Sequence, residues 1–214
     1  MKSSYPKIVE SFLFDLSLEV SRQGGHLLLT DREYVRHPKS GIMMNGYYSS
    51  GRPRKLVVAT KKKFTSWLPV LVHESCHLDQ DLEGSTVWRD LIVAPWQKDA
   101  HELIFEAIQK PEEFDDGDLS DFIRRVQAVE RDCEERAVAK IDLWNLPIDE
   151  EEYIRRANSY LWYFAMLPEL RMWYPTGREP YNNPDVWKNC PNHFAGDYSV
   201  VPRPLEEAYI QYCS

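Results

Sequence analysis

The sequence has no long apolar run, and this absence limits the kinds of protein it can encode. Its longest apolar stretches, Trp67 to Val72 and Leu161 to Leu167, fall far short of the roughly 18 residues that a membrane span needs. Residues 1–10 also lack the apolar core of a signal peptide. We therefore expect a soluble, cytoplasmic protein with no membrane partner.

Cysteines are few, and basic residues are outnumbered by acidic ones, 26 against 34. The 214 residues include four cysteines, none in a CxxC pair, which indicates reduced thiols and not a disulfide framework. The net charge of -8 argues against a nucleic-acid partner, because such proteins usually present a basic face. Two short basic clusters, residues 52–55 and 61–63, flank a predicted strand, and we interpret them as solubilising charges that protect a sheet edge.

The remaining composition is that of an ordinary globular protein. Hydrophobic residues make up 43% and charged residues 28% of the chain, and its length suits one domain with an added end. From Pro168 onward, prolines recur among aromatic residues, a composition too aromatic for a flexible linker. We predict one domain over residues 1–167 and an extended C-terminal segment over residues 168–214 that packs on it.

The spacing of apolar residues predicts helices around a small sheet, hence an α+β fold. We expect a first helix from Val9 to near Gly24, a second from Thr65 or Ser66 to Leu82, with one of these residues as its cap, and further helices over 99–109, over 120–144 and from Asp149 onward. An acidic loop is expected at 111–118, and three strands at 26–30, 43–48 and 55–60.

The second helix carries the strongest motif, His73-Glu74-Ser75-Cys76-His77. Histidines four residues apart project from one face of a helix, where both imidazoles can bind a single Zn²⁺ ion. Glu74 directly follows the first histidine, so its carboxylate can take a proton from water at the metal. The motif therefore predicts a zinc-dependent hydrolase, namely a small peptidase, with Glu74 as general base. We interpret Cys76 as a small buried residue.

A catalytic zinc needs a third protein ligand, and Glu130 is the leading candidate. It shares a helical stripe with apolar residues, namely Ile123, Val126, Cys133 and Ala137. A carboxylate on such a stripe should face the interior, where it needs a partner such as a metal. Glu134 lies one turn later on the same side of the helix, whereas Arg131 and Glu135 fall on the solvent face.

These residues together resemble the gluzincin metallopeptidases, the compact minigluzincins among them. The shared pattern is HExxH followed by a distant helix with Glu-x-x-(small)-(acid)-x-x-Ala, and it covers roughly residues 40–145. The resemblance implies a zincin-like α+β domain with a small, mostly antiparallel sheet. It also implies one Zn²⁺ per chain, held by His73, His77 and Glu130, and a peptide or protein substrate. Glu134 would support a ligand histidine. The chain departs from the pattern at Cys133, where alanine is usual, and at Glu134, where Asp or Asn is usual. The stretches 129–137 and 146–164 are also similar to uncharacterised small metallopeptidase-like proteins of bacteriophages.

Several alternatives stay open. Glu83 stands six residues after His77, the register of the third metzincin ligand, although Gln80 replaces the glycine usual there. His101 is either a third ligand or a stabiliser of the oxyanion. Other candidates for the oxyanion role are the tyrosines Tyr153, Tyr160 and Tyr163. Asp79 is expected to face solvent.

The expected peptidase also needs a surface for its substrate. Either of two strands, 43–48 or 55–60, is expected to form a sheet edge that pairs with an extended peptide. Two alternatives to the peptidase are a catalytically silent zinc-binding protein and a phage protein that binds a host factor on the same fold.

Overall fold

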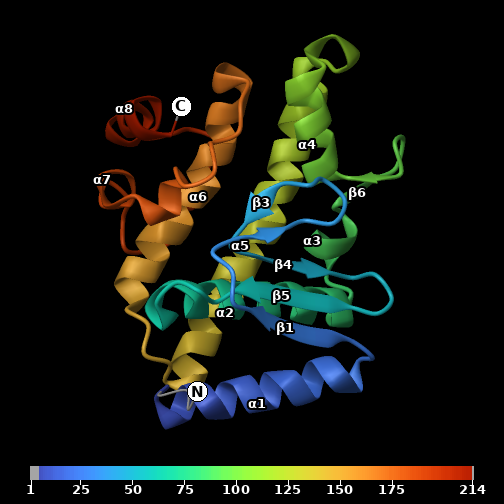
Figure 1. The fold of residues 1–214 in the computed structure, drawn as a ribbon. Coiled ribbons are helices and arrows are strands. Elements are labelled where there is room, and N and C mark those ends of the chain that lie inside the picture. Colours follow the sequence, from blue (N-terminus) through green and yellow to red (C-terminus); the bar gives the residue numbers. More distant parts are fainter. Residues whose placement is uncertain (1–4, 214) are drawn as a thin grey trace. The chain divides into compact units, whose positions relative to one another are not determined.

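The computed structural model describes residues 5–213 and confirms an α+β fold. Within these residues it contains eight α-helices and short strands in three small sheets (Figure 1). The chain divides into two compact units, the first formed by Met1–Gly84 with Glu135–Asp149 and the second by Ser85–Glu134 with Glu150–Ser214. The division at residue 167 that the composition suggests stays a prediction.

The first unit contains the larger sheet and the helix that carries the HExxH motif. Its elements are α1 (Lys7–Arg22), β1 (His26–Thr30), β2 (Val35–Arg36), β3 (Met43–Met44), β4 (Gly46–Ser49), β5 (Lys55–Ala59), α2 (Phe64–Glu83) and the C-terminal end of α5 (Asp116–Trp144). α1 and β1 match their expected ranges closely. Gly24, with φ of 68°, turns the chain between them, and glycine adopts this left-handed conformation without steric cost.

The sheet is mixed, not mostly antiparallel as the sequence suggested. Its strand order is β1-β5-β4, with β5 parallel to β1 and antiparallel to β4. The strand expected at 43–48 is also divided at Asn45, because β3 pairs with β2 while β4 pairs with β5. Since β5 is central in this sheet, it cannot be the edge that was expected of residues 55–60, whereas β4 is at an edge.

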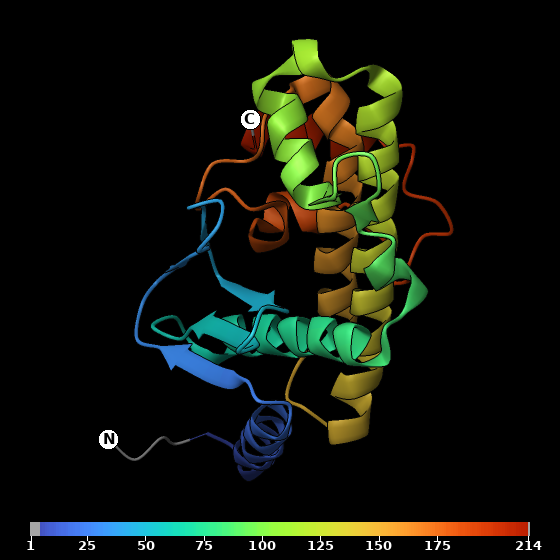
Figure 2. The same cartoon turned by 90° about the vertical axis from the view of Figure 1, so that its right-hand side faces the viewer.

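α2 covers one face of this sheet and approaches β4 closely (Figures 1 and 2). A Cβ atom at Gly46 would lie 2.8 Å from Cγ1 of Val70, so only glycine fits at this position of β4. The helix begins one residue earlier than expected, after Lys63, and neither Thr65 nor Ser66 caps it. Pro69 therefore lies inside the helix, beyond its first turn, and the helix ends at Gly84 in a left-handed conformation.

The end of α5 that belongs to the first unit contacts both α1 and α2. The ring of Trp144 packs edge-on against Phe12, with 5.5 Å between ring centroids. Lys140 donates from Nζ to Oγ of Ser75, at 2.9 Å, and to Oδ2 of Asp79, at 2.6 Å. Asp79, whose side chain is 34% exposed, is therefore held in an ion pair that anchors α2.

The second unit is mainly helical. Its elements are α3 (Thr86–Arg89), β6 (Ile92–Val93), β7 (Lys98–Asp99), α4 (Ala100–Gln109), η1 (Pro111–Glu113), the N-terminal part of α5, α6 (Glu150–Leu170), η2 (Pro180–Asn182), α7 (Pro184–Trp187) and α8 (Arg203–Tyr212). α5 begins at Asp116, earlier than expected, so the last three residues of the expected acidic loop, 116–118, belong to this helix. Asp116 and Asp118 lie in its first turn, where carboxylates interact favourably with the helix dipole.

The C-terminal residues are not simply extended, since they form η2, α7 and α8 and contribute to the core of this unit. Val186 and Leu205 are fully buried in that core. Tyr209 donates from its hydroxyl to the carbonyl of Ser159 on α6, at 2.6 Å. Within residues 5–213, no helix combines the length and apolarity that crossing a membrane requires.

Candidate functional site

α2 brings the three residues of the HExxH motif together on one helix. The Nε2 atoms of His73 and His77 lie 3.1 Å apart, and the two rings are nearly perpendicular at 89°. His77 and Glu74 are buried, whereas His73 is partly exposed. The four-residue spacing thus places two imidazole nitrogens at one point on the helix surface.

The separation of these nitrogens suits a shared zinc ion. With Zn–N bonds of about 2.0–2.1 Å and tetrahedral angles, two ligand nitrogens lie about 3.3 Å apart. The distance of 3.1 Å between His73 Nε2 and His77 Nε2 differs from this by a few tenths of an ångström. The donor set is also appropriate, since imidazole nitrogen is a common zinc ligand.

The buried face of α2 holds one polar contact that the sequence did not reveal. Gln80 is completely buried, and its Oε1 lies 2.8 Å from Nδ1 of His77. The only sequence signal was a glutamine three residues after a candidate ligand, a spacing that places both side chains on one side of a helix. Cys76 is likewise fully buried, and its sulfur is not part of a disulfide.

In the second unit, Glu130 lies at one end of a carboxylate–imidazole–carboxylate chain, with His101 at its centre. Its side chain, on α5, is 4% exposed, and its Oε1 lies 3.2 Å from Nε2 of His101. Nδ1 of His101 lies 3.0 Å from Oδ1 of Asp99, the residue that caps α4. His101 is thus a hydrogen-bond partner of Glu130, the candidate third ligand.

His101 is positively charged at neutral pH. Burial lowers its pKa, but hydrogen bonds to Asp99 and Glu130 raise it more strongly, together with the charges of both carboxylates, so that the pKa of His101 is about 10. Both ring nitrogens then carry protons, and each donates to one carboxylate. The imidazolium of His101 therefore faces the buried carboxylate of Glu130.

Glu134 and Tyr153, two further candidates, lie together in the second unit. Tyr153, on α6, donates a short hydrogen bond from its hydroxyl to Oε2 of Glu134, and both side chains are buried. The other two tyrosines are packing residues. Tyr160 stacks edge-on against Phe164 and Tyr181, and Tyr163 is fully buried.

The rival ligand Glu83 is on the surface at the end of α2. Its side chain is 57% exposed, and its Oε2 accepts a hydrogen bond of 2.9 Å from Nη1 of Arg136. A ligand of a catalytic zinc is normally buried and oriented by its surroundings. The surface ion pair therefore disfavours the metzincin register.

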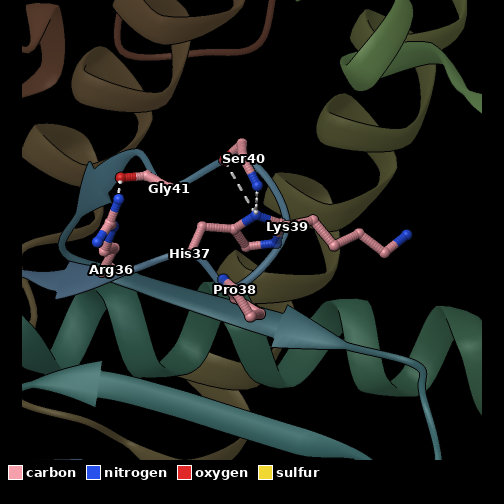
Figure 3. Close-up of a pocket in the computed structure, with 6 residues that line it drawn as sticks. All are labelled: Arg36, His37, Pro38, Lys39, Ser40 and Gly41. Carbon is pink, nitrogen blue, oxygen red and sulfur yellow. Dashed lines mark hydrogen bonds between the residues drawn. The ribbon is translucent and has the colours of Figure 1, made fainter.

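A separate surface hollow lies in the loop between β2 and β3, lined by residues 36–41 (Figure 3). Arg36 closes this loop by donating from Nε to the carbonyl of Gly41, at 3.1 Å. Nδ1 of His37 lies 3.1 Å from Oγ of Ser40. The loop is therefore a turn stabilised by hydrogen bonds between its own residues, and it contains none of the candidate site residues.

Comparisons with known proteins give no relative for this site. No protein-family model, no curated protein and no solved structure matches the chain. Any function therefore has to be argued from the residues and their geometry.

Proposed function

We propose that this chain is a zinc-dependent peptidase in which His73 and His77 hold the ion and Glu74 is the general base. The observation that supports it most strongly is the pair of Nε2 atoms 3.1 Å apart on α2, next to a buried Glu74. A core histidine pair has no need of an adjacent buried carboxylate, whereas a hydrolytic zinc site does.

The roles of the residues follow from their chemistry. Bound zinc would lower the pKa of a water molecule and polarise the scissile carbonyl. Glu74 takes the proton of the attacking water and passes it to the leaving amine. β4, at the edge of its sheet, offers backbone groups to an extended peptide, and His101 or Tyr153 would stabilise the oxyanion.

Glu130 is the third ligand implied by the gluzincin resemblance, and its buried carboxylate beside His101 supports that role. His101 donates to Oε1 of Glu130, which fixes the orientation of the carboxylate. Cys133, a fully buried cysteine on α5 three residues after Glu130, is the competing candidate. Thiolate is a common zinc ligand, so variants at both positions are needed to separate the two.

The zinc content of the purified protein tests the metal site. We expect about one zinc per chain in the wild type, a large loss in Glu130→Ala, and retention in Cys133→Ala and Glu83→Ala. Loss in Cys133→Ala with retention in Glu130→Ala would assign the third position to Cys133. A wild type that takes up no zinc at neutral pH refutes the proposal.

Cleavage of an unstructured protein tests the reaction. Zinc-loaded wild type should cleave it, and Glu74→Gln should keep its zinc but lose cleavage, because an amide cannot accept the proton. Full zinc occupancy without any cleavage would instead identify a silent zinc-binding or interaction protein. The four free cysteines fit the reducing, cytoplasmic location that we also propose.

A further inference from the structure

Gln80 is the one fully buried amide side chain on α2, and its burial needs an explanation. A polar group buried away from water destabilises the fold unless it is hydrogen-bonded. Gln80 is 0% exposed, and its Oε1 meets Nδ1 of His77 at 2.8 Å. This contact is therefore part of what makes the position of Gln80 stable.

The contact also fixes the chemistry of His77. A carbonyl oxygen of an amide only accepts hydrogen bonds, so Nδ1 of His77 must carry the proton. In the neutral ring, Nε2 then keeps its lone pair, and this atom is the one that lies 3.1 Å from Nε2 of His73. Metal binding through Nε2 requires this tautomer, and metal-binding histidines are commonly held in it by an acceptor at the other nitrogen.

We propose that Gln80 is a positioning residue that fixes the tautomer and ring orientation of His77 for metal binding through Nε2. This inference rests on the proposed zinc site. It adds a partner that the gluzincin resemblance does not provide, since that resemblance gives the supporting role to Glu134 alone. His77 then receives its support from its own helix, three residues away.

Three variants separate this role from simple packing. Gln80→Met keeps the length and helix propensity of the side chain but removes the acceptor. Gln80→Glu keeps an acceptor at the same position, and Gln80→Asn withdraws it by one methylene group. Ser75→Ala is the matched control, because Ser75 is also fully buried and polar on α2 but donates to the carbonyl of Val72 and accepts from Lys140, neither of which is a candidate ligand.

The first readout is the tautomer of His77 in the zinc-free, full-length protein, measured by long-range ¹H–¹⁵N correlation NMR. Wild type, Gln80→Glu and Ser75→Ala should show the proton on Nδ1. Gln80→Met and Gln80→Asn should shift His77 toward the form protonated on Nε2. Protonation of Nε2 in the wild type would mean that the amide nitrogen faces His77, and it would overturn the inference.

The second readout is zinc affinity, measured by competition with a chelator. Removing a partner of a ligand typically weakens metal binding 10–100-fold, so we expect about this loss in Gln80→Met and Gln80→Asn. Gln80→Glu should bind zinc at least as tightly as the wild type, and Ser75→Ala within a few-fold. Equal affinities of the wild type and both acceptor-free variants would overturn the inference while leaving the zinc site intact. A wild type without zinc refutes the proposed function instead.

The visible spectrum of the cobalt-substituted protein adds a signature that packing alone would not move. Gln80→Glu should preserve the wild-type absorption bands, whereas Gln80→Met should alter them, because the ligand ring is free to turn. If Gln80→Met fails to fold, Gln80→Asn carries the same comparison. Unchanged bands in both variants count against a positioning role.

Discussion

Gly46→Ala tests how closely β4 and α2, the helix with the HExxH motif, must approach each other. The new Cβ would lie 2.8 Å from Cγ1 of Val70, 3.0 Å from the carbonyl oxygen of Val57 and 3.2 Å from Cγ2 of Val58. Val70 cannot readily turn away, because a valine in a helix has one strongly preferred rotamer. The helix or the strand must therefore shift.

The expected loss of stability is that of an overpacked core, about 1–3 kcal/mol. For a chain of this length, each kcal/mol lowers the melting temperature by about 2–4 °C, so we expect a decrease of about 2–12 °C. Zinc affinity should fall as well, since His73 lies one turn after Val70 on the helix that shifts. Thermal unfolding followed by circular dichroism measures the first effect and chelator competition the second.

Two further variants test whether the close approach of Gly46 to Val70 causes the loss of stability. Gly51→Ala is the control, because its nearest neighbour would be Oγ of Ser49 at an ordinary 3.6 Å, so its stability should change by less than about 0.5 kcal/mol. In Gly46→Ala/Val70→Ala, the new methyl group takes space that Val70 has left, and a favourable coupling of about 0.5–3 kcal/mol should result. A single variant as stable as the wild type, or a double variant without coupling, would refute the close approach.

Three other predictions concern individual groups. Glu74→Gln should retain zinc in elemental analysis but lose measurable peptide cleavage, since the base is gone. Tyr153→Phe leaves the buried Glu134 without its hydroxyl donor and should cost about 1–3 kcal/mol in urea unfolding. Burial raises the pKa of Cys190 to about 12 and that of Cys213 to about 11, from an ordinary 9.0. Because the two thiols ionise first in the unfolded chain, their contribution to stability should be constant below about pH 9 and be lost as the pH rises toward these values, so the fall above pH 9 should be shallower in Cys190→Ala/Cys213→Ala.

Local patterns predicted much of the secondary structure, since helix periodicity and strand alternation need no distant partner. α1 and β1 could be placed because their apolar spacing and the glycines between them lie within a few residues. The sheet could not be derived in this way. Parallel pairing of His26 with Lys55 and the break of a strand at Asn45 depend on which segments meet in space.

In the candidate site, too, the sequence predicted features within one helix but not contacts between distant segments. The pair His73 and His77 followed from helix geometry alone, and the burial of Glu130 followed from its apolar stripe. The partner of Glu130 did not, because His101 is 29 residues away in the sequence. The spacing of Gln80 and His77 in the sequence allows a contact between them, but only the structure shows that Oε1 of Gln80 meets Nδ1 of His77.

The support of His77 by Gln80 has a consequence for His73. With the proton of His77 on Nδ1, the contact of 3.1 Å between the two Nε2 atoms is a hydrogen bond only if Nε2 of His73 donates it. Zinc binding through both Nε2 atoms must displace this proton, so His73 should change its tautomer on zinc binding while His77 keeps its proton on Nδ1. Long-range ¹H–¹⁵N NMR of the protein without and with zinc measures both rings. A His73 already protonated on Nδ1 in the zinc-free protein, or a His77 that changes its tautomer when zinc binds, would contradict this reasoning, because the two imidazoles would then not share one proton between their Nε2 atoms.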